Sequence, residues 1–295
     1  MLEKSSFCKV NLLLNVLGRR PDGFHEVETL MHPVALHDRL CFARSGRDIH
    51  LTCSDPILPV NAKNLVFRAA ALFLKQAAIN EGVRIHLDKR IPISAGLGGG
   101  SGNAAATLLA LNELFGRPLA AATLRELAVA LGSDVPFFLQ NRPALATGRG
   151  EILTPLEFFP ALRSAYILLI HPGFGISTSW AYQQLDRFPE AQNGPPGRAA
   201  SLTARLRAGD RAGAGREFYN SLEAPALRKY PLLELFQRFL RKNGAWAALM
   251  SGSGSATFAL ADSKGSAEHL ADGFKAEFGP KCWMAVVKMS EAENG

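Results

Sequence analysis

The first third of the chain alternates apolar and polar residues in the manner of β-strands. The period of two across Phe7 to Gly18 predicts a strand with Lys9 and Asn11 on one face and Leu12 and Leu14 on the other. The proline and glycine of segment 19–23 predict a turn, after which a second strand is expected to return antiparallel to the first. That second strand is predicted at 27–33, further strands at 40–42, 49–53 and 83–88, and a helix at 65–78.

A similar mixture of elements continues to the end of the chain. Apolar spacing predicts a helix over 122–131 that ends at Gly132, and segment 133–138 is expected to begin a short helix because proline is tolerated in a first turn. From about residue 155, strands are predicted at 165–171, 246–250, 256–261 and 283–287, helices at 177–185, 202–222 and 232–243, and a surface loop at 186–201. Strands and helices of similar weight in each half indicate an α+β protein.

The segment 91–108 interrupts this pattern with closely spaced glycines that run into an alanine-rich helix, expected over 103–115. Glycine permits positive φ and close approach, so successive N–H groups can face one concavity. The helix that follows adds its unpaired N–H groups and the positive end of its dipole. A flexible linker is the alternative, but a linker does not ordinarily open onto an apolar helix that needs a core. The segment therefore predicts a polyphosphate-binding loop. Its glycines are Gly96, Gly98, Gly99, Gly100 and Gly102.

Two familiar phosphate-binding loops do not fit this segment. A Walker A loop ends in Gly-Lys-Ser or Gly-Lys-Thr, whereas no lysine lies between Arg90 and Arg117. The dinucleotide-binding fingerprint needs a buried strand directly before the glycines and an acidic residue about 20 positions later. Here the strand 83–88 alternates as a half-exposed strand does, Glu113 comes too early, and Glu126 falls within a predicted helix. A third class of phosphate loop is required.

Composition narrows the class of protein and its partners. Apolar residues at 47% and charged residues at 20% are typical of a globular protein, and 295 residues predict two domains, which we expect at 1–155 and 156–295. A formal net charge of +7 suits an anionic small substrate. It would also suit weak nucleic-acid binding, but 8% aromatic residues without interleaved basic residues disfavour such a partner.

The sequence predicts no metal centre, secretion signal or membrane span. The four cysteines have no paired spacing and the histidines do not cluster, so the cysteines are expected to be reduced and buried. The first residues lack the apolar core of a signal peptide, and the longest apolar runs are too short to cross a bilayer. We expect a cytoplasmic protein without a membrane partner.

Two charged residues and a pair of glycines each have two interpretations when read without a family resemblance. Asp134 precedes a proline and could cap a short helix, the commoner use of such an aspartate, or it could accept the proton of an acceptor hydroxyl beside a lysine. Lys9 could supply that lysine or be an exposed lysine of an edge strand. Gly252 and Gly254 could form a tight turn between strands or permit close approach to an anion.

Three separated blocks together resemble the GHMP kinases: the strand around Lys9, the loop 92–105, and Met-Ser-Gly-Ser-Gly-Ser-Ala-Thr-Phe at 250–258. Within that superfamily, Gly-Arg-Arg-Pro-Asp-Gly-Phe-His-Glu-Val-Glu-Thr-Leu at 18–30 resembles the kinases of a cytidine-diphosphate-linked methylerythritol. Mevalonate, homoserine and galactose kinases lack this second block. Shorter matches at 64–70, 131–138 and 220–223 extend the resemblance over nearly the whole chain.

The resemblance implies a two-domain α+β GHMP kinase fold, with a ribosomal-protein-S5-like N-terminal domain, a ferredoxin-like C-terminal domain and the active site in the cleft between them. It also implies transfer of the γ-phosphoryl group of ATP, with Mg²⁺, to the 2-hydroxyl of the cytidine-linked alcohol, in the non-mevalonate route to isoprenoid precursors. Such chemistry needs mainly positioning and neutralisation of charge.

Roles carried over by position place Asp134 as the catalytic base and Lys9 as its partner. Phe24 and His25 would hold the cytosine ring, with Asn11 and Thr178 nearby. The implied ATP-binding residues are Asn64, Lys89, Pro92, Gly96, Leu97, Gly98, Gly99, Gly100, Ser101, Gly102 and Asn103. The implied substrate-binding residues are Asn11, Phe24, His25, Thr178, Gly252, Ser253 and Gly254.

Two positions depart from the family pattern, since many members have serine at 102 and tyrosine at 24. Gly102 would drop a hydroxyl contact or loosen the loop, and Phe24 keeps the ring but loses a hydrogen bond. Magnesium is expected to be held largely by phosphates and water, with Ser101 as a candidate ligand. A kinase of another small alcohol and a non-catalytic binding protein of this fold are the alternatives. As an enzyme, the chain is expected to act as a monomer or homodimer.

Overall fold

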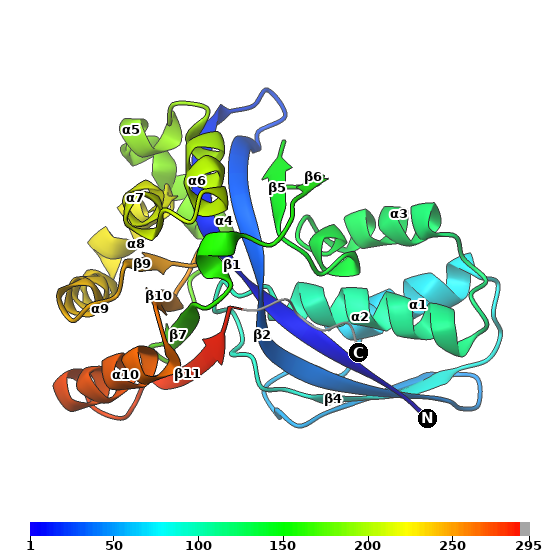
Figure 1. Ribbon diagram of the computed structural model, residues 1–295. Helices are drawn as coiled ribbons and strands as arrows, with labels where there is room; N and C mark the ends of the chain where they lie inside the picture. Colours follow the sequence, from blue (N-terminus) through cyan, green and yellow to red (C-terminus); the bar gives the residue numbers. More distant parts are fainter. Residues whose placement is uncertain (290–295) are drawn as a thin grey trace.

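Two long antiparallel strands, β1 (Leu2–Arg19) and β2 (His25–Arg44), run through the middle of this computed structural model, which describes residues 1–289 (Figure 1). The predicted strands 27–33 and 40–42 are parts of β2, because the pairing with β1 shifts register near residue 35 and the strand continues past the shift. A second register shift falls between Asn11 and Leu13. Such bulges bend a strand and turn its side chains to new directions.

The first sheet has the strand order β3-β4-β2-β1-β8, with β5 and β6 added beside β2. Besides β1 and β2, its strands are β3 (Ile49–Cys53), β4 (Val83–Asp88), β5 (Ala144–Thr147), β6 (Ile152–Pro155) and β8 (Tyr219–Asn220). The two-residue strand β8 comes from the second half of the chain and pairs in parallel with β1. The first sheet is therefore not built from residues 1–155 alone.

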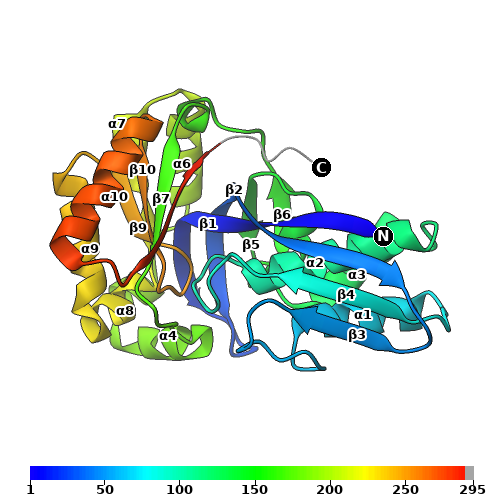
Figure 2. The ribbon, with the colours of Figure 1, turned by 90° about the horizontal axis from the view of Figure 1, so that it is seen from below.

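Helices α1 (Leu65–Gln76), α2 (Gly99–Leu114) and α3 (Ala121–Leu131) pack beside this sheet, followed by the 3₁₀ helix η1 (Pro136–Leu139) (Figure 2). Helix α2 is enclosed because its alanines are small enough for α1 and β1 to approach closely. Its buried side chains share one core with Phe42, Phe73 and Phe137.

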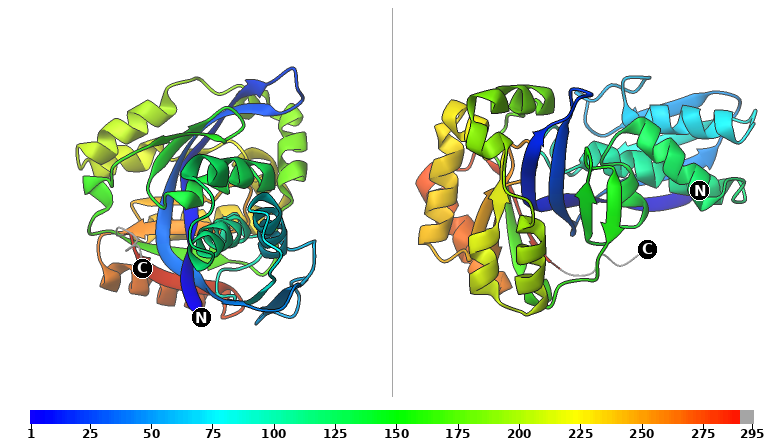
Figure 3. Two further views of the ribbon diagram at one scale, coloured as in Figure 1. Left: turned by 90° about the vertical axis from the view of Figure 1, so that its right-hand side faces the viewer. Right: turned by 90° about the horizontal axis from the view of Figure 1, so that it is seen from above.

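The second sheet has the order β11-β7-β10-β9, comprising β7 (Tyr166–His171), β9 (Ala247–Met250), β10 (Thr257–Ala261) and β11 (Trp283–Lys288). One face packs on β1, joining Val10 and Leu12 to Leu169 and Phe258 in a second core. The other face carries α9 (Pro231–Lys242) and α10 (Lys264–Phe278) over a third core. Figure 3 shows β1 and β2 between these two groups of helices.

The remaining elements are short and connect the two sheets. They are η2 (Pro160–Leu162), α4 (Thr178–Gln184), η3 (Leu185–Arg187), α5 (Pro189–Gln192), α6 (Arg198–Arg207), α7 (Arg211–Glu217) and α8 (Glu223–Lys229). The α+β prediction is confirmed.

Several predicted element boundaries were wrong. The single helix expected at 202–222 is divided into α6, α7 and β8, because Gly209 adopts a positive φ and Asp210 begins a new helix by accepting from Gly213 N. The loop expected at 186–201 contains α5 and the start of α6. The sequence analysis did not predict α10, β5 or β6. Of the four cysteines, all free, only Cys8 is buried, so burial of the other three was also wrong.

Candidate active site

The glycine-rich segment forms a loop that leads into α2 four residues earlier than expected, at Gly99 instead of 103. Gly98 precedes the helix with a φ of +70°, a left-handed conformation that favours glycine. The bond from Gly102 N to Gly98 O, 2.9 Å long, opens the helical ladder. The N–H groups of Gly99, Gly100 and Ser101 precede it, so they have no partner within the helix and are available to an anion.

The loop is held between β1 and the second glycine-serine segment. Lys9 N donates to Leu97 O (2.9 Å), Ala256 N donates to Ala95 O (3.0 Å), and Ser251 Oγ donates to Gly96 O (3.0 Å). A Cβ at position 96 would overlap Ser251 O, and one at position 98 would lie 2.7 Å from the Phe138 ring. The three sequence blocks therefore meet at one place, and the close packing requires glycine there.

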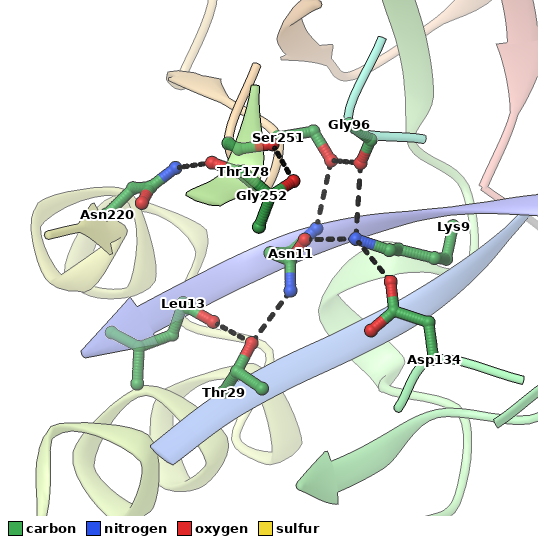
Figure 4. Close-up of polar contacts among 11 residues, drawn as sticks. Lys9, Asn11, Leu13, Thr29, Gly96, Asp134, Thr178, Asn220, Ser251 and Gly252 are labelled. Atoms are coloured by element: carbon green, nitrogen blue, oxygen red, sulfur yellow. Dashed lines mark hydrogen bonds and ion pairs between the residues drawn. The ribbon is translucent and has the colours of Figure 1, made fainter. Parts of the chain in front are cut away.

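Lys9 and Asp134 meet beside this loop (Figure 4). Lys9 Nζ lies 3.7 Å from Asp134 Oδ2, and it also donates to Asn11 Oδ1 and to Gly96 O (3.1 Å). The Lys9 side chain is 4% exposed and that of Asp134 is 42% exposed. Lys9 is thus not a solvated edge lysine, since its side chain is buried and its backbone N–H bonds to the glycine-rich loop. Nor does Asp134 cap η1, which begins after Val135 without a side-chain cap.

Two adjoining pockets open from this pair. The inner pocket is lined by Lys9, Asn11, Asp134 and the two glycine loops, and the outer pocket by Phe24, His25 and Asp134. The residues that line both pockets are Asp134, Arg149, Thr178 and Tyr182. The pockets therefore form one continuous site, with the carboxylate of Asp134 where they join. Its walls come from both halves of the chain.

Aromatic side chains and an arginine shape the outer pocket. Phe24 is 53% exposed, and Arg149 Cζ lies 4.6 Å from the centre of its ring. The rings of His25 and Tyr182 have centroids 5.1 Å apart. Burial, aided by the charge of Arg19, lowers the pKa of His25, so the imidazole is neutral at pH 7. Burial and the charge of Asp134 raise the pKa of the Tyr182 hydroxyl, which therefore remains a hydrogen-bond donor.

The implied substrate residues are divided between the two pockets. Gly252 and Ser253 line the inner pocket, where Thr178 Oγ1 and Ser253 Oγ are 2.9 Å apart. Asn11 also lines the inner pocket, against Lys9, and does not line the outer pocket with Phe24 and His25. Gly254 lines neither pocket; its φ is +82°, and a Cβ there would collide with the Met250 side chain.

Other implied ATP-site residues make bonds that fix the framework of the loop. Lys89 Nζ pairs with Asp38 Oδ2 at 2.6 Å, and Asn103 Nδ2 donates to the same oxygen at 2.8 Å. Asn64 Oδ1 caps α1 by accepting from Val66 N. Leu97 is buried and Pro92 is partly buried. A side chain at Gly102 would face Phe7 O, 2.7 Å from its Cβ, so a serine hydroxyl there would point toward β1.

The residues at or beneath the site that the sequence analysis missed include Thr29, Asp38, Arg149 and Tyr182. Tyr182 lies four positions after Thr178, on the same helix face, and this spacing could have identified it. Arg149 stands between two glycines, which is a weaker signal. Asp38 accepts bonds from the segment 89–91 and from Asn103, but no spacing in the sequence indicates those contacts.

Within residues 1–289, no cluster of three or more histidine, cysteine, aspartate or glutamate side chains is arranged to hold a metal ion. The helices of the same residues include none that is long and apolar enough to span a membrane.

The chain matches models of a known protein family and the sequences of named enzymes. A model of the GHMP kinases N terminal domain matches residues 64–142, and one of the GHMP kinases C terminal domain matches residues 202–281. The chain is 39% identical over 278 residues to the 4-diphosphocytidyl-2-C-methyl-D-erythritol kinase of Synechococcus sp. (strain JA-2-3B'a(2-13)), covering 92% of this chain and 88% of that protein. It is 42% identical over 265 residues to the enzyme of the same name from Pelotomaculum thermopropionicum, covering 90% of each.

Solved structures extend the comparison to three dimensions. A crystal structure of 4-(cytidine 5'-diphospho)-2C-methyl-D-erythritol kinase matches with a TM-score of 0.82 at 38% identity, covering 97% of this chain and 99% of that one. Homoserine kinase from Cytophaga hutchinsonii matches with a TM-score of 0.72 at 23% identity, covering 97% and 96% of the two chains. The second likeness concerns the fold alone.

Proposed function

Because the chain belongs to the GHMP kinases and, among them, to the 4-diphosphocytidyl-2-C-methyl-D-erythritol kinase family, we propose that it transfers the γ-phosphoryl group of ATP to the 2-hydroxyl of 4-diphosphocytidyl-2-C-methyl-D-erythritol. This reaction belongs to the non-mevalonate route to isoprenoid precursors. The observation that carries the proposal is the Lys9–Asp134 pair at the junction of the two pockets, beside the N-terminus of α2.

Asp134 is the proposed base. Its carboxylate is 42% exposed and lines both pockets, so an acceptor hydroxyl bound between them could donate its proton to Oδ1 or Oδ2. The ammonium of Lys9, 3.7 Å from Asp134 Oδ2, would neutralise the phosphoryl oxygens as charge develops on them.

The start of α2 is the proposed seat of the ATP phosphates. The N–H groups of Gly99, Gly100 and Ser101 and the positive end of the helix dipole would face the phosphate oxygens. Gly102 and Asn103 would act indirectly, since the Gly102 amide is bonded to Gly98 O and the Asn103 side chain is bonded to Asp38. The remaining implied ATP residues, Asn64, Lys89, Pro92 and Leu97, would support or border the nucleotide.

Magnesium would accompany ATP in this proposal. Among the described residues that line the inner pocket, Asp134 is the only carboxylate, which fits an ion held mainly by phosphate oxygens and water. The hydroxyl of Ser101, in the first turn of α2, is the side chain proposed to join them. The ion would supply neutralisation of phosphate charge.

The outer pocket would hold the cytidine part of the acceptor. Phe24 and Tyr182 offer ring faces for a base, neutral His25 can exchange hydrogen bonds with its edge, and Arg149 offers charge to a diphosphate. Thr178 and the 252–254 loop would hold the alcohol near Asp134.

We further propose that the enzyme is cytoplasmic, acts as a monomer or homodimer, and needs no nucleic acid or membrane.

A product assay tests the function. Purified protein is incubated with MgATP and the cytidine-linked alcohol, and ADP release is measured together with formation of a phosphomonoester. Mevalonate, homoserine and free methylerythritol serve as competing acceptors. The proposal predicts turnover only with the cytidine-linked alcohol. Turnover of another alcohol at a higher kcat/KM would assign a different substrate, and no turnover of any would overturn the kinase assignment.

A further inference from the structure

A chain of hydrogen bonds continues from Lys9 into β2 (Figure 4). Lys9 Nζ donates to Asn11 Oδ1, Asn11 Nδ2 donates to Thr29 Oγ1 at 2.8 Å, and Thr29 Oγ1 donates to Leu13 O at 2.6 Å. Asn11 is 3% exposed and Thr29 is 5% exposed. Water therefore has little access to replace any of these bonds.

The donor and acceptor in each of these hydrogen bonds are fixed by the groups at the two ends of the series, Lys9 and Leu13. A backbone carbonyl can only accept, so the single hydroxyl proton of Thr29 is committed to Leu13 O. Thr29 Oγ1 must then accept from the NH₂ group of Asn11, which turns the amide oxygen of Asn11 toward Lys9. The ammonium of Lys9 can only donate, so the other end requires the same orientation. Only one arrangement of the Asn11 amide satisfies every group.

A β-bulge in β1 changes which residue of that strand lies opposite Thr29. The register pairs Asn11 with Met31 but Leu14 with Thr29, because one extra residue of β1 lies between Asn11 and Leu13. The bulge reverses the alternation, so Leu14 lines the same pocket as Lys9 and Asn11, contrary to the face predicted from strict alternation. Its partner Thr29 faces that pocket too. Thr29 lies on the same face of β2 as Met31, the partner of Asn11, and the bulge places Leu14 in place of Leu13 opposite Thr29.

We propose that Thr29 is a positioning residue that acts through Asn11 to hold Lys9 against Asp134, and this inference rests on the function proposed above. Lys9 has three protons, and its neighbours are three oxygens: Asn11 Oδ1, Gly96 O at 3.1 Å and Asp134 Oδ2 at 3.7 Å. Two fixed acceptors aim the remaining proton at Asp134. Without the Thr29 hydroxyl, the Asn11 NH₂ loses its acceptor, so the orientation of the Asn11 amide toward Lys9 is no longer fixed from this side.

Removal of the hydroxyl tests this role in the full-length protein. Thr29→Val keeps the branched shape, and we expect kcat to fall roughly tenfold while KM for ATP and for the acceptor change by no more than about twofold. Thr29→Ser keeps the hydroxyl and is expected to stay within about twofold of the wild type in kcat. The matched control is Thr107→Val, which removes another buried hydroxyl that donates to a backbone carbonyl, Asn103 O, but should not lower kcat.

A double-mutant cycle distinguishes action through Asn11 from a general loss of stability. In an Asn11→Ala background the amide is absent, so Thr29→Val should cost no further activity beyond about twofold. Melting temperatures are measured for each variant, and Thr29→Ala replaces Thr29→Val in the same cycle if the latter does not fold.

Three results would overturn the inference. The first is a double mutant in which the losses of kcat from Asn11→Ala and Thr29→Val multiply. The others are a raised KM at unchanged kcat in Thr29→Val, and a loss of kcat in Thr107→Val equal to that in Thr29→Val. These results require an active wild type. A wild type without turnover would contradict the proposed function itself, so the two failures are distinguishable.

Discussion

Phe24 shows how a single residue departs from its ordinary use. A phenylalanine after a turn normally enters a core, but here the ring is 53% exposed, with Arg149 above it. Exposure of a large apolar ring beside a pocket indicates a binding surface.

Replacement of this ring tests the outer pocket. Since base stacking on an aromatic side chain contributes about 1–3 kcal/mol, Phe24→Ala should raise KM for the cytidine-linked acceptor roughly tenfold or more and leave KM for ATP within about twofold. Phe24→Tyr keeps the ring and serves as the control. Steady-state kinetics with each substrate varied in turn measure both constants, and equal weakening of the two substrates would rule out this use of Phe24.

The lowered pKa of His25 predicts how kcat/KM for the acceptor depends on pH. Burial and the charge of Arg19 lower its pKa, so the neutral imidazole persists below the ordinary histidine value of about 6.5. We expect kcat/KM for the acceptor to stay level as pH falls from 8 to about 6.5 and to decline only at more acidic pH, where protonation charges the ring. In His25→Gln this acid decline should be lost. An unchanged acid decline in that variant would show that another group causes it.

Individual residues were only partly predictable from sequence. Lys9, Asp134 and the loop glycines could be nominated because their types and spacing carry recognisable chemistry. Thr29 and Asp38 could not, since their roles depend on a bulge and on strand register, and a slip of one residue would turn each side chain to the opposite face. Asn103 was assigned to the nucleotide, although its side chain is bonded to Asp38 and Ser6.

At the scale of elements, α8 supports the 251–254 loop through Glu223. Its Oε1 accepts from Met250 N at 2.7 Å and from Gln237 Nε2 of α9. Burial raises the pKa of Glu223 to about 7, despite the opposing effect of these hydrogen bonds and of Arg241. The folded protein therefore binds a proton that the unfolded chain releases as pH rises from 4.5 toward that value.

This shift predicts a pH-dependent stability. A raised carboxyl pKa means that the contribution of Glu223 to the free energy of unfolding falls as pH rises from about 4.5 to 7 and then stays low. Glu223→Gln keeps an oxygen acceptor without titrating, so it should be more stable than the wild type at pH 8 by roughly 1–2 kcal/mol, with little difference at pH 5.

Urea unfolding at both pH values measures this difference. The exposed Glu234 of α9 gives the matched control, since Glu234→Gln should leave the pH dependence unchanged. A Glu223→Gln variant less stable than the wild type at pH 8 would contradict the assigned cause.

Elements were predicted best where periodicity is strong. α1, α3 and the strands of the second sheet follow their patterns, whereas β2 was divided because a bulge near residue 35 breaks its alternation. Helix α10 was missed because only three of its residues, Ala267, Leu270 and Phe274, are buried, so the helical period of apolar residues is weak there. In the segment 202–222, Gly209 interrupts what had been predicted as one helix.

The whole molecule brings three distant segments of the chain to one junction. β1 supplies Lys9, the α2 loop supplies free amides, and the second half supplies the 251–254 loop that covers both. The division at residue 155 remains a prediction, and β8 crosses it to pair with β1. That these three segments meet at one site could be predicted only from the family resemblance. Periodicity in the sequence does not determine which sheets pack together.

The central claim is that the carboxylate of Asp134 accepts the acceptor proton while the α2 loop holds ATP. The most direct test compares the wild type with Asp134→Asn for both turnover of the cytidine-linked alcohol and binding of MgATP. Loss of the base should lower kcat by about 10²–10⁴-fold, with Kd for MgATP within about threefold of the wild type. Near-normal turnover by Asp134→Asn would contradict the account.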